Sequence, residues 1–272
     1  MIEEKSPAKI NLSLRVVGKR KDGYHELETL MHELDLHDRL YLGATGKDTF
    51  SCDNKNVPTD RANLIWRAVD LFRKHSGIKE GVRIRLEKKI PLGGGLGGGS
   101  SNAIVVLQHL FIKHRLLEKE GGFKLLEEMS AELGSDTNFF LFGGTALCRG
   151  RGEKIETLED RSYYFSLIFP EFGCDTAKVF AHYEKEDSKI LDKEEPRVVN
   201  HLEPACRRAY PEIDRLFNMV RAEDIEIFLT GSGSTLFTIH DTSPDRDSTY
   251  EKLKRILKTE KVVVSKTQSA SH

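Results

Sequence analysis

Six glycines occur among the eleven residues 91–101, and the sequence on either side of them limits what this segment can be. Apolar and charged residues alternate over residues 82–87, which predicts a half-buried strand that Pro91 ends. Beyond the glycines, Ser100 and Ser101 can cap an amphipathic helix. A glycine loop between a strand and a helix N-terminus lets backbone N–H groups and the helix dipole converge on an anion. The segment therefore predicts a phosphate-binding loop.

The residues that follow the glycines exclude the commonest loop of this kind. A Walker A loop places a lysine directly after its last glycine, whereas the next lysine downstream here is Lys113. The dinucleotide fingerprint is met by Gly93, Gly95 and Gly98, as almost any glycine run would meet it. The preceding strand is polar on one face, however, and the first strand of a dinucleotide-binding fold is apolar on both. A Rossmann oxidoreductase therefore stays as a weaker alternative.

The composition limits the class of protein and its partners. Of 272 residues, 42 are Lys or Arg and 43 are Asp or Glu, so the net charge of −1 provides no field that attracts nucleic acid or an anionic membrane. The four cysteines are widely spaced, which suggests neither a disulfide framework nor a zinc site. The chain lacks an apolar stretch of membrane-spanning length and a signal peptide. We therefore expect a soluble cytoplasmic protein without nucleic acid or membrane partners.

Hydrophobic periodicity predicts an α+β protein with two domains, at residues 1–158 and 159–272. A hairpin turn is expected at Asp22-Gly23, and Gly134 is expected to end a helix. The predicted strands and helices are segregated into antiparallel groups rather than alternating along the chain. Strands are expected at residues 9–16, 29–42, 82–90, 145–149, 164–169, 235–240 and 261–266, and helices at residues 63–75, 100–114, 123–133, 211–222 and 248–258.

Several polar residues could carry chemistry, and each also has an ordinary structural explanation. Lys9 and Asn11 share the polar face of the first strand, which could be a solvated edge. Asp136 could equally cap the helix that follows it. Tyr24-His25 beside a turn could be surface packing, and the glycine-serine segment at residues 231–234 could be a hairpin turn. Taken singly, these residues leave the alternatives open.

The order of five motifs along the chain is more specific than any one of them. They are Ser6-Pro7-Ala8-Lys9-Ile10-Asn11-Leu12, Asp22-Gly23-Tyr24-His25-Glu26-Leu27, residues 91–101, Leu133-Gly134-Ser135-Asp136 and Thr230-Gly231-Ser232-Gly233-Ser234. Together these motifs resemble the galactokinase, homoserine kinase, mevalonate kinase and phosphomevalonate kinase superfamily, over nearly the whole chain. The opening motif and Gly23-Tyr24-His25 are similar to the branch that phosphorylates the 2-hydroxyl of a cytidine-diphosphate-linked sugar alcohol in isoprenoid synthesis.

The resemblance implies a fold and also shows where this chain departs from the family. It implies an N-terminal nucleotide domain like ribosomal protein S5 and a ferredoxin-like C-terminal domain, with the active site in the cleft between them. Thr137-Asn138 stands where the family usually has a proline soon after the aspartate. Asn102 and Ile104 replace the more usual aspartate and alanine. The shape of the aspartate loop is the feature that these changes leave open.

The resemblance also implies the parts of a phosphotransferase site. Asp136 would accept the proton of the attacking hydroxyl, and Lys9 would lie beside it. ATP is the implied phosphate donor and Mg²⁺ the implied metal; the sequence names no ligand set for the ion, although Ser101 is a candidate. The residues implied for ATP binding are Pro91, Leu92, Gly93, Gly94, Gly95, Leu96, Gly97, Gly98, Gly99, Ser100 and Ser101.

The implied substrate is a small molecule that carries a cytidine diphosphate, bound by a monomer or homodimer. Aromatic faces would sandwich the base, and a second glycine-rich wall would approach the diphosphate. Another small-molecule kinase of the superfamily is the nearest alternative, and a non-catalytic nucleotide-binding or RNA-binding module is the alternative from a different class. The residues implied for substrate binding are Asn11, Tyr24, His25, Phe180, Gly231, Ser232 and Gly233.

Overall fold

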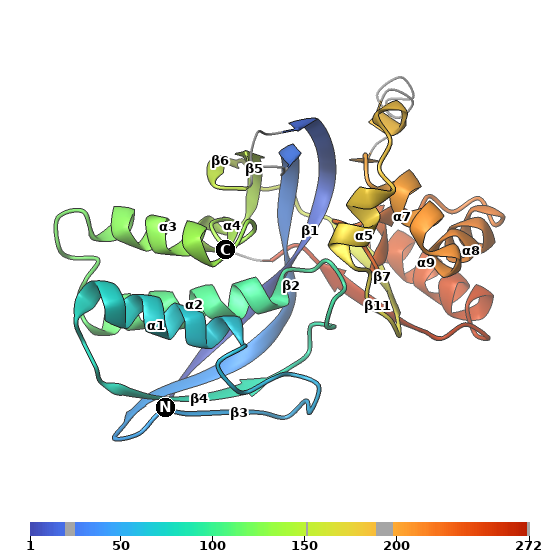
Figure 1. Cartoon of the computed structure of the whole chain (residues 1–272). Helices are drawn as coiled ribbons and strands as arrows, with labels where there is room; N and C mark the ends of the chain where they lie inside the picture. Colours follow the sequence, from blue (N-terminus) through green and yellow to red (C-terminus); the bar gives the residue numbers. More distant parts are fainter. Residues whose placement is uncertain (20–24, 151, 189–197, 271–272) are drawn as a thin grey trace.

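The strands form two sheets, and the α+β prediction is confirmed (Figure 1). A computed structural model describes residues 1–19, 25–150, 152–188 and 198–270, so the predicted turn at Asp22-Gly23 lies outside the described residues. In these ranges the strands are β1 (Ile2–Lys19), β2 (His25–Thr45), β3 (Thr49–Cys52), β4 (Gly81–Glu87), β5 (Thr145–Gly150), β6 (Lys154–Leu158), β7 (Tyr164–Pro170), β8 (Val199–Asn200), β9 (Phe228–Leu229), β10 (Leu236–His240) and β11 (Val262–Gln268).

The described helices lie between these strands. They are α1 (Leu64–Ser76), α2 (Gly98–Lys113), α3 (Gly122–Leu133), α4 (Phe139–Phe142), α5 (Thr176–Ala181), α7 (Glu203–Ala209), α8 (Pro211–Arg221) and α9 (Ser243–Ile256).

The first sheet has the order β3-β4-β2-β1-β8, with β5 on a further stretch of β2 and β6 beside β5. Its pairs are antiparallel except β3 with β4 and β1 with β8. Helices α1, α2 and α3 stack together on one side of this sheet (Figure 1). Their apolar faces meet the sheet in a core that includes Trp66, Phe72, Phe111 and Phe139. Periodic apolar residues in α1 and α2 therefore position the N-terminus of α2 over the sheet.

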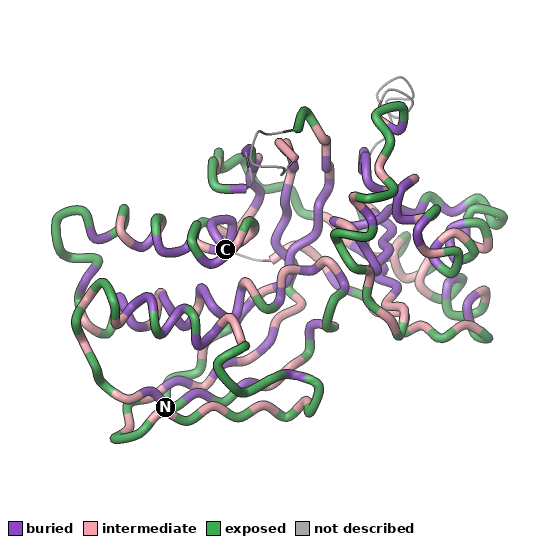
Figure 2. Tube along the Cα trace, in the orientation of Figure 1, coloured by how far each residue is buried: buried purple, intermediate pink, exposed green. Residues whose placement is uncertain are grey.

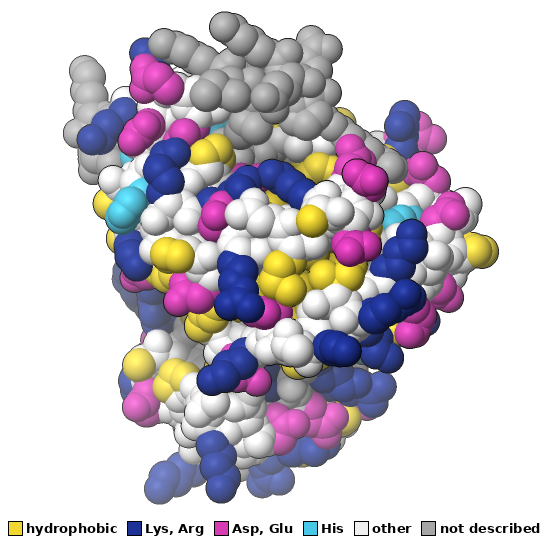
Figure 3. All heavy atoms as spheres, turned by 90° about the vertical axis from the view of Figure 1, so that its right-hand side faces the viewer, with side chains coloured by type: hydrophobic (Ala, Val, Ile, Leu, Met, Phe, Trp, Pro, Cys, Tyr) yellow, Lys and Arg dark blue, Asp and Glu magenta, His cyan; other side chains and the backbone are white. Residues whose placement is uncertain are grey.

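The second sheet has the order β11-β7-β10-β9 and is antiparallel throughout. Helices α7, α8 and α9 pack around it, with Ile213, Phe217 and Leu253 fully buried. On the face of the molecule shown in Figure 3, Lys and Arg side chains are interspersed with Asp and Glu rather than gathered into a patch of one sign.

The two sheets are joined by apolar packing and by chain crossings. Ile10 of β1 packs with Phe165 of β7 and Phe237 of β10, and Figure 2 shows buried residues through the middle of β1 and β2. The C-terminal end returns to β2, where the N–H of Ala270 donates to the carbonyl of Glu33. The chain changes sheet between β6 and β7, while β8 pairs with β1. The exact division at residue 158 stays a prediction.

Two local predictions are wrong, and a third is confirmed: Gly134 ends α3, in an extended conformation (φ 177°). Helix α2 begins at Gly98 rather than at the serines, because Gly97 adopts the left-handed conformation (φ 70°) at the N-cap without a side-chain cap. Helix α9 begins five residues early, at Ser243, because Thr242 accepts a hydrogen bond from the N–H of Asp245 and so caps it.

Candidate active site

A buried carboxylate fixes the chain where it enters the glycine loop. Asp38 of β2 is completely buried, and its Oδ1 accepts from the N–H groups of Lys89 (2.7 Å) and Ile90 (2.8 Å). Its Oδ2 accepts from Lys88 Nζ (2.5 Å) and Asn102 Nδ2 (3.0 Å). The amide of Asn102 thus donates to Asp38, where the more usual aspartate would place a second carboxylate. Sequence reasoning missed Asp38 because one acidic residue inside a strand has no distinguishing signal.

The loop needs glycine because it is packed on both sides. A Cβ at Gly97 would lie 2.7 Å from Cζ of Phe140 and 3.2 Å from Cγ of Lys9. A Cβ at Gly95 would lie 2.7 Å from the carbonyl oxygen of Thr230. Both glycines also have positive φ, which L side chains adopt only with strain. The predicted phosphate loop therefore lies against Lys9 on one side and against the second glycine-rich segment on the other.

Lys9 and Asp136, which are 127 positions apart in the sequence, form an ion pair beside this loop. Lys9 Nζ lies 3.2 Å from Asp136 Oδ2, and the exposed fractions of the two side chains are 3% and 36%. Helix α4 starts only after Asn138, so the alternative in which Asp136 caps that helix is wrong. The turn is held by Thr137, whose hydroxyl oxygen lies 2.5 Å from the carbonyl oxygen of Ser130 and 2.7 Å from that of Gly134, so that its single O–H is shared between them. Thr137 thus supplies the fixed turn for which the family usually has a proline.

Asn11 holds Lys9 in position. Its Oδ1 accepts from Lys9 Nζ at 2.7 Å and from the hydroxyl of Thr230 at 3.2 Å. Its Nδ2 donates to the hydroxyl of Thr29 at 2.7 Å. Both Lys9 and Asn11 are only 2% exposed, so the solvated-edge explanation is wrong. The β1–β2 register shifts on either side of this stretch, and such bulges commonly re-aim side chains next to active sites.

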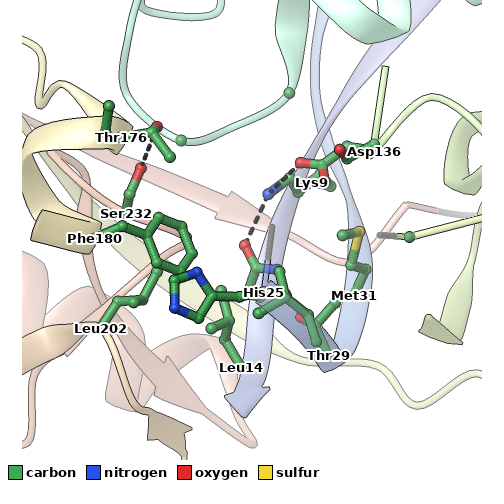
Figure 4. A pocket seen from close by; sticks show the side chains of 18 residues that line it. Lys9, Leu14, His25, Thr29, Met31, Asp136, Thr176, Phe180, Leu202 and Ser232 are labelled. Atoms are coloured by element: carbon green, nitrogen blue, oxygen red, sulfur yellow. Dashed lines mark hydrogen bonds and ion pairs between the residues drawn. The ribbon is translucent and has the colours of Figure 1, made fainter. Parts of the chain in front are cut away.

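A cavity of about 640 Å³ opens beside this ion pair, with β1 and β2 on one side and α5 on the other (Figure 4). The residues predicted for catalysis or substrate binding that line it are Lys9, Asn11, His25, Asp136, Phe180, Gly231 and Ser232. Its lining also includes residues that sequence reasoning missed, whose apolar or hydroxyl side chains gave no signal: Leu14, Leu27, Thr29, Met31, Thr176, Ala177 and Leu202.

The far end of this cavity is aromatic. The rings of His25 and Phe180 stack with centroids 4.7 Å apart and an interplanar angle of 16°. Burial, aided by the positive charge of Lys19, lowers the pKa of His25, which favours the neutral ring at pH 7. Tyr24 lies outside the described residues. Gly233 is placed behind the cavity wall, because a Cβ there would meet the sulfur atoms of Cys206 and Cys174.

A second cavity, of about 420 Å³, lies on the other side of the glycine loop. Gly95 and Gly97 line both cavities, so the loop is a wall that the two share. Val57, Leu64 and Lys88 extend the second cavity, and none of them was predicted. Ser100 lines it, whereas Ser101 is fully buried and accepts a hydrogen bond from the hydroxyl of Ser6. The serine that faces this cavity is therefore Ser100 rather than the predicted metal-ligand candidate Ser101.

Two further features describe the chemistry of the molecule. Within the described ranges, no group of three or more His, Cys, Asp or Glu side chains is arranged to hold a metal ion. A helix long and apolar enough to cross a membrane is also absent from the part of the chain that the structure describes.

Comparison with known families shows what the chain is similar to. Residues 63–144 match the model of the GHMP kinases N terminal domain, and residues 188–259 match that of the GHMP kinases C terminal. The chain is 38% identical over 256 residues to the 4-diphosphocytidyl-2-C-methyl-D-erythritol kinase of Bacillus pumilus, covering 87% of each chain. It is 34% identical to the kinase of the same name from Clostridium botulinum, over 97% of this chain and 99% of the relative.

Solved structures agree with these relatives. A crystal structure of 4-(cytidine 5′-diphospho)-2C-methyl-D-erythritol kinase superposes with a TM-score of 0.79 and 32% identity, over 99% of this chain and 100% of the other. A mevalonate kinase from Methanococcus jannaschii, 17% identical, shares the fold with a TM-score of 0.69 over 99% of this chain and 98% of its own. The chain therefore belongs to the GHMP kinase family and, within it, to the 4-diphosphocytidyl-2-C-methyl-D-erythritol kinases.

Proposed function

We propose that this chain transfers the γ-phosphate of ATP to the 2-hydroxyl of 4-diphosphocytidyl-2-C-methyl-D-erythritol, a step of isoprenoid precursor synthesis. The main support for the proposal is the position of the glycine loop. The loop separates two cavities, and the Lys9–Asp136 pair lies on one side of it. Phosphoryl transfer needs donor and acceptor to meet in line, with little covalent work by the protein. A loop with a cavity on each side suits that requirement.

In the proposed mechanism, the loop amides and the N-terminus of α2 bind the ATP phosphates. The Asp136 carboxylate accepts the proton of the acceptor hydroxyl as its oxygen bonds to the γ-phosphorus, and the bond to the bridging oxygen breaks to release ADP. Lys9 has three N–H donors, and its contacts to Asn11 and Asp136 leave one for the reacting oxygens. Asn11 therefore positions Lys9 and is not itself available to the substrate through Oδ1.

Mg²⁺ is part of the proposal. This ion usually keeps several waters and binds through one or two carboxylates and the substrate phosphates, not in an all-protein cage. Among the residues that line the second cavity, the hydroxyl of Ser100 would supply one oxygen to an ion held mainly by the phosphates and water. When bound, the ion would neutralise charge on the triphosphate.

The cytidine end is proposed to bind at the aromatic end of the larger cavity. The cytosine base would stack on the Phe180 face that His25 covers in this structure, with Tyr24 as the second aromatic group. A neutral imidazole has one donor and one acceptor, which suits the hydrogen-bonding edge of cytosine. Gly231 and Ser232 would line the path of the diphosphate.

The enzyme is proposed to be cytoplasmic, monomeric or homodimeric, and to act on a small molecule. The near-neutral net charge favours the absence of nucleic acid or membrane partners. The test of the function is ADP release with ATP and Mg²⁺ in the presence of the cytidine substrate, mevalonate, homoserine or galactose. We expect turnover only with the cytidine substrate. Turnover only with another acceptor would overturn the substrate, and a folded protein that releases ADP with none would overturn the kinase activity.

A further inference from the structure

Two cysteines that the proposed reaction does not use meet behind the substrate cavity. The sulfur atoms of Cys174 and Cys206 lie 3.8 Å apart. Cys174 precedes α5 and is partly exposed, whereas Cys206 lies within α7 and is buried. The pair therefore consists of one partly exposed cysteine and one buried cysteine whose sulfur lies beside it.

The two sulfurs lie against the wall that is proposed to face the substrate diphosphate. A Cβ at Gly233 would lie 3.2 Å from Cys206 Sγ and 3.3 Å from Cys174 Sγ. Two residues after Cys174, the hydroxyl of Thr176 hydrogen-bonds that of Ser232 at 2.8 Å (Figure 4). Cys174 is therefore connected to the cavity lining both through the start of α5 and through the glycine-rich turn.

The surroundings make the two thiols unequal. The hydrogen bond from Cys206, helped by the charge of Lys178, lowers the pKa of Cys174. The same contact and burial raise the pKa of Cys206. By contrast, burial raises the pKa of Cys52 and brings that of Cys148 to about 12. Because the thiolate is the nucleophile, we expect Cys174 to react before the other cysteines.

We propose that Cys174 and Cys206 are a thiol–disulfide modification site that takes a low-molecular-weight disulfide, and that its oxidation weakens substrate binding. The Cys174 thiolate attacks one sulfur of the reagent, forming a mixed disulfide and releasing one thiol. Cys206 then loses its proton and attacks the Cys174 sulfur, which releases the second thiol. Two protein thiols are oxidised and one disulfide is reduced to two thiols, so atoms and electrons balance.

The expected effect on the enzyme rests on the proposed function. Disulfide formation brings the sulfurs from 3.8 Å to about 2.05 Å, which moves the start of α5 and with it Thr176 and Phe180. Neither cysteine lines the cavity that contains Ser100 and Lys88. We therefore expect oxidation to raise the KM for the cytidine substrate several-fold and to leave the Kd for ATP within twofold.

Oxidised glutathione is the probe, applied to the full chain and followed by peptide mass analysis. We expect a Cys174–Cys206 linked peptide that has lost two hydrogens and is restored by dithiothreitol. The Cys206→Ala variant should stop at a glutathione adduct on Cys174, and Cys52→Ala should still form the link. Absence of the linked peptide, or an adduct that forms first on Cys52, would overturn the site.

Kinetic measurements on the same samples test whether oxidation of Cys174 and Cys206 weakens substrate binding. Wild-type protein should show the rise in KM after oxidation, and Cys174→Ser treated identically should not. A linked peptide without any change in KM would overturn the coupling to substrate. Because the peptide analysis needs no turnover, failure of the proposed function would leave that readout intact.

Discussion

Gly97 and Gly99 are glycines for different reasons, and this difference allows the phosphate loop to be tested. Gly97 has φ +70°, and a Cβ there would collide with Phe140. Gly99 lies in the first turn of α2 with nothing within 4 Å of an added Cβ, and it lines the second cavity. Glycine at position 99 is thus not required by packing of the protein alone.

We predict that Gly99→Ala weakens ATP binding without loss of stability. Alanine in a helix is favoured over glycine by about 0.5–1 kcal/mol, so the Tm should stay equal or rise. The added methyl occupies space that the phosphates would need, so the Kd for ATP should increase, as isothermal titration would measure. Gly97→Ala is the matched control and should lower both the Tm and ATP affinity. Unchanged ATP affinity in Gly99→Ala would place the phosphates elsewhere.

For single residues, the sequence predicted which residues belong to the site better than it predicted whether they are buried. Lys9, Asn11 and Asp136 were found by resemblance to motifs, yet alternation along the first strand equally suggested a solvated edge. The burial of Lys9 and Asn11 depends on residues far away in the chain, such as Thr230, which no local pattern reveals. Ser101 was misassigned because the start of α2 is set by the conformation of Gly97.

Among the elements, β4 and α1 are tied together by one carboxylate. Asp48, just before β3, accepts from both terminal nitrogens of Arg73 in α1 (2.7 and 2.8 Å) and from the N–H of Val82 in β4 (3.1 Å). The hydrogen bonds from Arg73 lower the pKa of Asp48 from 3.8 to about 2. These hydrogen bonds of Asp48 fix the end of the first sheet that lies opposite the active site.

We predict that Asp48→Asn destabilises the protein at neutral pH and not in strong acid. A folded pKa of about 2 against 3.8 contributes about 2 kcal/mol above the unfolded pKa, and this is lost as the pH falls through the folded pKa. Urea unfolding should therefore show that difference at pH 7, shrinking below about pH 4. Asp70→Asn, which removes an exposed partner of Arg61, should cost below about 1 kcal/mol. A difference that stays constant to the lowest pH at which the protein folds would contradict the assignment.

The elements with strong periodicity were the most predictable from sequence. Helix α1 begins after Asn63, whose side chain accepts from the N–H of Ile65, so its start is encoded locally. The two-residue strand β8 has no comparable signal, because its pairing with β1 is specified only by the packed molecule. The conformation of Gly134 likewise depends on the turn that Thr137 holds.

For the whole molecule, the glycine loop is where both halves of the fold meet. It leads from β4 to α2 in the first half, and Gly95 packs against Thr230 next to β9 in the second. Thr230 also accepts from the N–H of Asn11 at 2.9 Å. The α+β class and the two-domain organisation were predictable from segregated periodic segments. The shared wall between the two cavities was not, because it depends on contacts between segments more than a hundred residues apart.

The role of Asp136 and the separation of the two cavities are tested together by the Asp136→Asn variant, measured for both turnover and ATP affinity. We predict a kcat lowered by about 10²–10⁴-fold, because the hydroxyl loses its proton acceptor. The Kd for ATP should stay close to that of the wild type, since Asp136 lines the acceptor cavity and not the cavity on the other side of the loop. Near-normal turnover would contradict the role of Asp136. Loss of ATP binding together with turnover would contradict the separation of donor and acceptor by the glycine loop.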